Sequence, residues 1–178
     1  MERQIKRAKI FKGRVIEVVV DDIIIDEQKL AKREVVLHNG GVAIALKNHD
    51  GKFFMVRQYR YAANKEMLEF CAGKLEKDED PKTAIERECH EELGYTFKNL
   101  KALGSIIPTC GYCSERIYLF YAEADNYIGE DFDEDERIEK LSFTYAEIEK
   151  MIKDNLIDDA KTLALMYRIK MEGLDARD

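Results

Sequence analysis

The chain has 178 residues, of which 46% are hydrophobic and 37% are charged, and its formal net charge is -7. This length favours one well-buried domain over two independent cores. We expect a soluble cytoplasmic protein, because no apolar run is long enough for a membrane span or a secretion signal. A nucleic-acid ligand is disfavoured, since an acidic chain without a dense basic block cannot neutralise many phosphates.

The first third of the chain is rich in β-branched residues. Residues 8–20 and 21–38 hold such runs, joined by polar turns. They predict a small antiparallel sheet over residues 1–38, ahead of a main domain over residues 39–178. Within the main domain, His49-Asp50-Gly51 separates two apolar runs at 42–48 and 52–60, which is typical of a β-hairpin. Residues 63–73 are expected to be mostly irregular, with one short strand.

A helix is predicted over residues 81–93. Asp80 is a good N-cap, Pro81 suits the first helical position, and Gly94 suits a left-handed C-cap. Strands are expected afterwards at 100–108, 115–124 and 140–145, with an acidic loop over 126–139.

Two further helices end the chain. The first begins with a capping box of Thr144 and Glu147, and the second follows Asp158 and runs to about Met171. Strands and helices are mixed without strict βαβ alternation, so the predicted class is α+β.

The 81–93 helix carries two carboxylates beside its apolar face. At about 100° per residue, Glu88 and Glu92 fall one turn apart within the sector of the apolar residues. These residues are Ala84, Ile85, Cys89 and Leu93. Like charges one turn apart repel, so a cation between them is expected. Carboxylate oxygens suit a hard divalent ion such as Mg²⁺, with Mn²⁺ as a substitute, and Glu91 lies at the edge of the same face.

These residues belong to a longer pattern that resembles the Nudix box, G-x5-E-x7-R-E-U-x-E-E-x-G-U. Every fixed position is filled: Gly73, Glu79, Arg87, Glu88, Glu91, Glu92 and Gly94. The resemblance implies an α/β/α sandwich on a mixed sheet and Mg²⁺-dependent attack of water on a nucleoside diphosphate linked to another group. It makes Glu88 and Glu92 the main metal ligands, Glu91 an auxiliary one, and the Ala72 carbonyl a further ligand.

The resemblance also assigns residues beyond the metal ligands. Glu134 matches a loop base and Glu136 matches a ligand of a further Mg²⁺, although their roles are interchangeable from sequence. Glu91 and Arg87 join the catalytic group, Arg87 as a guanidinium that ties neighbouring carboxylates in place. The substrate-binding group comprises Arg57, Arg60, Glu69, Gly73, Tyr112 and Glu115.

Segments outside the box resemble the ADP-ribose pyrophosphatase branch. They are IFKGRV, REVVLHNGGVAIA, MVRQYRYAANKEMLEFCAGKLE and IDDAKTLALMYR. This branch implies a homodimer with exchanged N-terminal strands, and cleavage of ADP-ribose to AMP and ribose 5-phosphate. Cys110 stands where the branch carries a proline, which leaves GDP-mannose or another nucleotide sugar as the alternative. A nucleotide sensor without catalysis is a less favoured interpretation, because no box position is broken.

The spacing of Cys110 and Cys113 is that of a zinc half-site or a redox pair. Zinc would need a second cysteine pair at similar spacing, and a redox pair of the thioredoxin type would open a helix, whereas a strand follows here. Reduced thiols in a loop are the favoured interpretation.

Overall fold

The computed structural model describes residues 1–132 and 137–175. Its backbone divides into two compact units. The N-terminal unit comprises Met1–Gly40 and Ile107–Arg116, and the main unit comprises Gly41–Ile106 and Ile117–Asp178. Among the described residues, no helix combines the length and the apolar character needed to cross a membrane.

The N-terminal unit is built on an antiparallel sheet of three strands in chain order. They are β1 (Glu2–Lys12), β2 (Ile16–Ile25) and β3 (Lys29–His38). The segment 107–116 joins this unit through backbone hydrogen bonds, since Val36 N donates to Tyr112 O at 2.8 Å and Ser114 N donates to Val36 O at 2.9 Å. The predicted sheet is therefore confirmed, and its first strand begins six residues earlier than residue 8.

The main unit contains a seven-stranded mixed sheet. Its central order is β10-β5-β4-β9-β8, with β6 paired to β5 and β7 paired to β4. The strands are β4 (Gly41–Lys47), β5 (Phe53–Arg60), β6 (Lys65–Glu69), β7 (Cys71–Lys74), β8 (Tyr95–Ile106), β9 (Ile117–Tyr127) and β10 (Ile138–Phe143). Because β4 and β9 run parallel while the neighbouring pairs are antiparallel, the sheet is mixed, as predicted.

One local expectation in this sheet is confirmed at its turn, and another needs correction. The turn at His49-Asp50-Gly51 joins antiparallel strands, but β4 and β5 pair only at Lys47 and Phe53. Beyond that point β7 pairs with β4 and β6 pairs with β5. The expectation of a mostly irregular 63–73 stretch was wrong, because these two short strands occupy most of it, after a 3-10 turn at Tyr61–Ala63.

The box helix starts where the capping residues place it. Asp80 caps α1 (Pro81–Glu88) by accepting from Lys82 N and Thr83 N, and Gly94 ends the helical region at φ 74°. The last turn, Cys89–Leu93, is a π-helix rather than a continuation of the α-helix. The predicted extent is confirmed, whereas the wider turn was not expected.

The two later helices are α2 (Tyr145–Lys153) and α3 (Ala160–Met171). Thr144 and Glu147 form the predicted capping box of α2. The N-cap of α3 is Asp159 rather than Asp158, since the Asp159 side chain accepts from Thr162 N.

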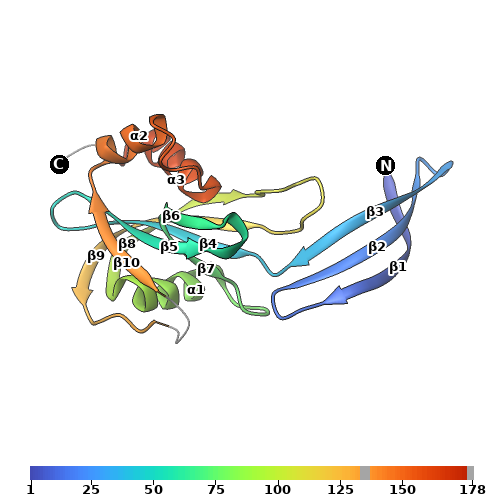
Figure 1. Cartoon of the computed structure of the whole chain (residues 1–178), viewed down its shortest axis with the longest axis horizontal. Coiled ribbons are helices and arrows are strands. Elements are labelled where there is room, and N and C mark those ends of the chain that lie inside the picture. Colours follow the sequence, from blue (N-terminus) through green and yellow to red (C-terminus); the bar gives the residue numbers. More distant parts are fainter. Residues whose placement is uncertain (133–136, 176–178) are drawn as a thin grey trace. The chain divides into compact units, whose positions relative to one another are not determined.

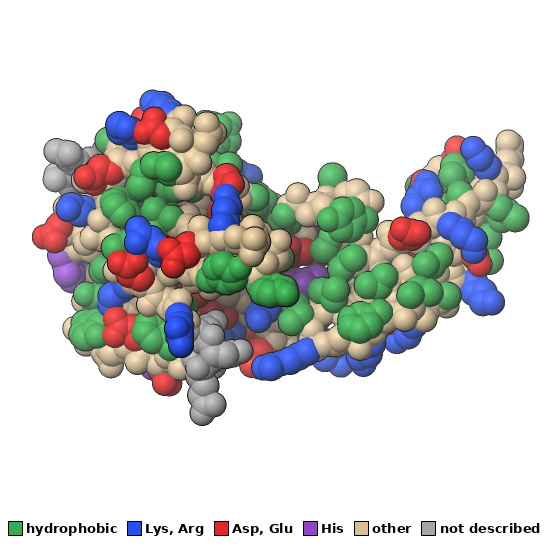
Figure 2. All heavy atoms as spheres, viewed as in Figure 1, with side chains coloured by type: hydrophobic (Ala, Val, Ile, Leu, Met, Phe, Trp, Pro, Cys, Tyr) green, Lys and Arg blue, Asp and Glu red, His purple; other side chains and the backbone are tan. Residues whose placement is uncertain are grey.

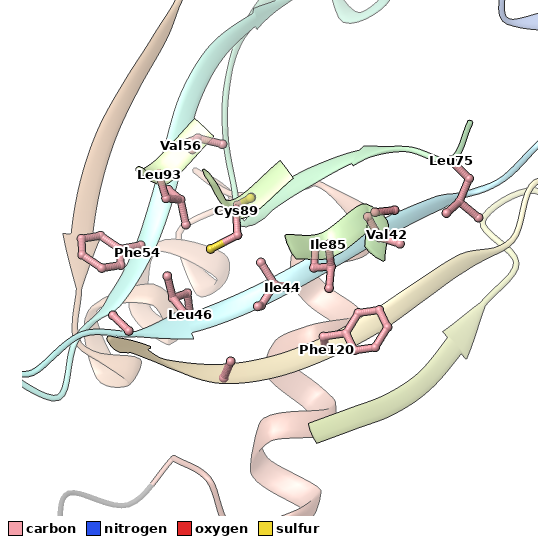
Figure 3. Close-up of a cluster of buried hydrophobic side chains, with 14 residues drawn as sticks. Val42, Ile44, Leu46, Phe54, Val56, Leu75, Ile85, Cys89, Leu93 and Phe120 are labelled. Carbon is pink, nitrogen blue, oxygen red and sulfur yellow. The ribbon is translucent and has the colours of Figure 1, made fainter. Parts of the chain in front are cut away.

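The main unit is a three-layer sandwich, with α1 on one face of the sheet and α2 and α3 on the other (Figure 1). Alternate residues of β4 face opposite layers, so nearly the whole strand is buried. Val42, Ile44 and Leu46 pack with Ile85 and Leu93 of the box helix, as Figure 3 shows. Ala43 and Ala45 belong to the second core cluster, which contains Ile148, Leu165 and Ile169.

Candidate functional site

The box helix approaches the backbone of β7 closely at Gly73. A Cβ atom at this position would lie 1.7 Å from Cδ of Glu88 and 1.8 and 2.1 Å from its two carboxylate oxygens. Real Cβ atoms do not approach other atoms so closely. Glycine is therefore required at residue 73 for the Glu88 carboxylate to lie against the strand.

Glu92 is held against the neighbouring residue of the same strand. Its side chain is buried, with 3% of the residue exposed, and its Oε2 accepts a hydrogen bond from Ala72 N at 3.2 Å. The apolar residues beside it, Ala84, Ile85 and Cys89, are fully buried. The helical wheel thus identified the inward face of the helix correctly, including the buried carboxylate.

Arg87 connects the acidic residues of the box. Its Nη1 donates to Glu88 Oε1 at 2.8 Å and to Glu91 Oε2 at 2.9 Å. Its Nε and Nη2 donate to the two oxygens of Glu79, each at 3.3 Å, and Nη2 also donates to Lys74 O at 3.2 Å. Burial disfavours the charged forms of both Arg87 and Glu79. These contacts nevertheless hold the pKa of Arg87 above its ordinary value and the pKa of Glu79 below its ordinary value.

The donor set suits a hard divalent cation. Carboxylate oxygens of Glu88 and Glu92 lie beside successive residues of β7, Gly73 and Ala72. A side chain at residue 73 would occupy the space that the Glu88 carboxylate now fills. Among the described residues, no three His, Cys, Asp or Glu side chains form a compact metal cluster. Mg²⁺ does not require one, because it binds through one or two carboxylates and completes its shell with water and substrate phosphates.

Arg60 and Glu69 form a second charged group next to the box. Arg60 donates through Nε and Nη2 to the two oxygens of Glu69, at 2.9 and 2.7 Å. Glu69 is only 1% exposed. Burial alone would raise its pKa, but Arg60 and Lys161 together lower it, so the carboxylate is charged. The charge of Glu92 also acts on Arg60, which links this pair to the box.

The other predicted site residues lie elsewhere or outside the described residues. Arg57 pairs with Glu139 of β10 at 2.8 Å and takes no part in the Arg60 pair. Tyr112 and Glu115 belong to the N-terminal unit, where Tyr112 is exposed and Glu115 Oε1 lies 3.7 Å from His38 Nδ1. Glu134 and Glu136, the predicted base and additional ligand, fall outside the described residues.

Sequence reasoning missed two polar groups near these residues. At the start of α3, Lys161 Nζ donates to Glu69 Oε2 at 3.0 Å. Lys140 of β10 donates to Leu93 O at 2.8 Å, forms an ion pair with Glu130, and lies 4.9 Å from the ring centre of Tyr127. Lys161 is 92 residues from Glu69 and Lys140 is 47 residues from Leu93, so neither helical nor strand periodicity identifies these contacts.

A cavity of about 630 Å³ lies at the opposite end of β4, around the turn that precedes β5. Its lining includes Lys47, Lys52, Lys98 and Thr144 but no residue of the box. Gly73 pairs with Val42 near the other end of the strand. The chemistry therefore points to the box rather than to this cavity.

Comparison with known proteins agrees with this geometry. The model of the NUDIX domain matches residues 37–166, which is most of the chain. The chain belongs to the Nudix family. A solved structure described as an ADP compounds hydrolase superposes on this Nudix chain with a TM-score of 0.82 at 18% identity, covering 97% of this chain and 95% of the other. At that identity the match establishes the fold alone.

Relatives of this Nudix chain carry different names. A protein of Bacillus subtilis (strain 168) named ADP-ribose pyrophosphatase is 36% identical over 179 residues, covering 99% of this chain and 97% of its own. A methanol dehydrogenase activator of Bacillus methanolicus is 38% identical, covering 97% and 95%. A GDP-mannose pyrophosphatase of Cronobacter sakazakii is 32% identical over 80% of each chain.

Proposed function

We propose that this Nudix protein is a pyrophosphatase that hydrolyses ADP-ribose to AMP and ribose 5-phosphate in the presence of Mg²⁺. The observation that carries the proposal is the end-to-end similarity to a protein named ADP-ribose pyrophosphatase, combined with a box in which every fixed position is filled. The carboxylates of that box lie on one side of β7, where they are held by the protein itself.

In this proposal, one group of residues binds the cation and another accepts the proton of the attacking water. Glu88 and Glu92, with Glu91 beside them, hold the divalent cation, and Ala72 contributes its carbonyl. A bound divalent ion would polarise the phosphate oxygens and lower the pKa of a water molecule, so that a base could deprotonate this water for attack on phosphorus. Arg87 keeps Glu88 and Glu91 in place through its hydrogen bonds. Glu134, or Glu136 in its place, takes the proton of the attacking water.

Arg60 supplies positive charge that binds the diphosphate of the substrate. An acidic protein repels a diphosphate, so cations at the site are needed to bind it. Arg60 is fixed by Glu69 through two of its nitrogens. Its Nη1 finds no hydrogen-bond acceptor within residues 1–132 and 137–175, which leaves one edge of the guanidinium for phosphate oxygens.

GDP-mannose or another nucleotide sugar is the second candidate substrate. It is favoured by Cys110, which departs from the proline of the ADP-ribose branch, and by the relatives named GDP-mannose pyrophosphatase. The chemistry of the box would be unchanged, because the metal acts on the diphosphate that both substrates share.

The deciding experiment measures turnover of ADP-ribose, GDP-mannose, ADP-glucose and NADH, each with Mg²⁺ and with EDTA. Phosphate released from the products by alkaline phosphatase gives the rate, and chromatography identifies the products. We expect cleavage of ADP-ribose that depends on Mg²⁺ and exceeds the other rates at least tenfold. Preference for another sugar would redirect the substrate assignment, and no cleavage of any compound would favour a nucleotide sensor.

A pair of matched variants tests the assignment of the ligands. Glu92→Gln removes the charge of the buried box carboxylate, whereas Glu86→Gln makes the same change at an exposed position of the same helix. We expect the first to lower kcat by about 10³-fold, the scale on which lost charge stabilisation acts in catalysis, and the second to leave it unchanged. Equal activity of both variants would contradict the metal assignment.

We also propose that the protein is a homodimer that covers the N-terminal sheet. Hydrophobic side chains are visible on this sheet in Figure 2. The exposed ones include Ile5, Ile10, Phe11 and Leu30, with 51 to 72% of each residue accessible. Exposed apolar side chains gathered on one sheet are typical of an interaction surface. Light scattering should give the mass of two chains, and Ile10→Glu should halve it, while Leu156→Glu on the main unit should not.

A further inference from the structure

The start of α3 carries a set of polar side chains to which the proposed chemistry gives no role. Lys161 Nζ donates to Glu69 Oε2 at 3.0 Å and to Asp159 Oδ1 at 2.6 Å. Asp159 Oδ2 in turn accepts from both N and Oγ1 of Thr162, each at 2.9 Å. Thr162 Oγ1 accepts from Phe70 N at 3.0 Å, one residue before β7 begins.

Together with Arg60, these contacts form a chain of alternating charges. The order is Arg60, Glu69, Lys161 and Asp159, and consecutive members are joined by hydrogen bonds. The side chains of Glu69, Asp159 and Lys161 are 1, 9 and 18% exposed. The charges of the two cationic and two anionic side chains cancel. Their burial is therefore stable only while all four remain paired.

This arrangement determines which edge of Arg60 is available. Glu69 Oε1 accepts from Nε of Arg60, while Oε2 accepts from both Nη2 and Lys161 Nζ. The ammonium group of Lys161 thus binds the carboxylate oxygen that also accepts from Nη2 of Arg60. The side chain of Arg60 is 38% exposed, so the edge not bound to Glu69 is open to a ligand.

We infer that Lys161 is a positioning residue that, anchored by Asp159, fixes Glu69 and thereby aims Arg60 at the diphosphate of the substrate. The inference rests on the proposed function, because it assigns Arg60 to an anionic group of a nucleotide sugar. Lys161 itself is satisfied by two carboxylates and acts through Arg60. Its expected signature is weaker substrate binding with little change in the chemical step.

The test compares two lysine variants of α3 in the full-length protein. Lys161→Met removes the ammonium group and keeps a side chain of similar length. Lys170→Met makes the same change at an exposed position, where the amino group is 3.8 Å from Glu149. For Lys161→Met we expect KM for ADP-ribose, and Kd measured calorimetrically in EDTA, to rise about tenfold, the scale of one charged hydrogen bond. Its kcat should fall less than threefold, and Lys170→Met should match the wild type.

A double variant distinguishes positioning from a structural role. If Lys161 acts through Arg60, adding Lys161→Met to Arg60→Ala should change KM by less than twofold, because the positioned group is already absent. Lys161→Arg should restore Kd to within threefold. Independent effects that multiply in the double variant would overturn the inference. Should Lys161→Met fail to fold, Lys161→Gln replaces it with the same expected result, because its shorter, uncharged side chain lacks the ammonium group that bridges Glu69 and Asp159.

Different results would overturn the proposed function and the role of Lys161. Wild-type protein that neither binds nor cleaves any of the four nucleotides would overturn the proposed function and this inference together. Wild-type protein that is active and loses affinity on Arg60→Ala, but is unaffected by Lys161→Met, would overturn only the role of Lys161.

Discussion

Replacing Gly73 by alanine should disable the proposed metal site while leaving the fold intact. The added Cβ would lie 1.7 Å from Cδ of Glu88, whereas ordinary contact begins at 3.4 Å, so the carboxylate must move by more than 1 Å. Displacement on this scale costs about 10²-fold in rate when it affects a reacting geometry. Gly73 does not have the left-handed φ found at Gly94 and Gly104, so backbone strain adds nothing. Because Glu88 is a flexible side chain, the unfolding free energy should fall by only about 1 kcal/mol.

The assay for Gly73→Ala has two independent readouts. Turnover of ADP-ribose at saturating Mg²⁺ should fall about 10²-fold, and Mn²⁺ affinity, followed by electron paramagnetic resonance without substrate, should weaken. Gly111→Ala is the matched control for metal affinity, since a Cβ there meets no atom within 4 Å. Unchanged Mn²⁺ affinity and turnover in Gly73→Ala would refute the assignment of Glu88 as a ligand above β7.

Two further predictions concern charge and thiol reactivity. The ion pair with Lys140 and the hydrogen bond from Tyr127 lower the pKa of Glu130 to about 2. Since this folded-state pKa lies below the unfolded one, Glu130→Gln should lower the unfolding free energy by about 1 kcal/mol above pH 5, after allowance for solvent screening. In urea titrations, the difference in unfolding free energy between the wild type and Glu130→Gln should shrink as the pH falls toward 2. A difference that stays constant with pH would contradict this prediction. Cys71 and Cys89 are fully buried while Cys110 is exposed, so Ellman's reagent should modify Cys110 quickly and the buried pair only after unfolding.

Local signals predicted the elements whose determinants are close in sequence. Asp80 accepts from Lys82 N at 2.9 Å, and such a cap involves only neighbouring residues, so the start of α1 could be placed from sequence. The strands β6 and β7 are five and four residues long and depend on β5 and β4 for their pairing. Their positions follow from the partner strands, which a single window of sequence does not contain.

The same distinction applies to the candidate site. Glu88 and Glu92 lie on one helix, so their inward direction follows from the helical period. Lys161 and Glu69 are 92 residues apart in sequence, and only folding brings Lys161 Nζ to 3.0 Å from Glu69 Oε2. The π-turn at Cys89–Leu93 also escaped prediction, because the helical period assumes a uniform α-helix as far as Leu93.

The two inward carboxylates of the box are each bound by another group of the protein. Glu88 lies over Gly73 and is bound by Arg87, while Glu92 lies beside Ala72 and accepts its N–H. Both are thus fixed against adjacent residues of β7, one by a guanidinium and one by the backbone. Because the side chains are ordered beforehand, a cation that binds them spends little of its binding free energy on immobilising ligands. This preorganisation also explains why Gly73, which carries no charge, matters to the candidate site: a side chain there would displace the Glu88 carboxylate from its place against β7.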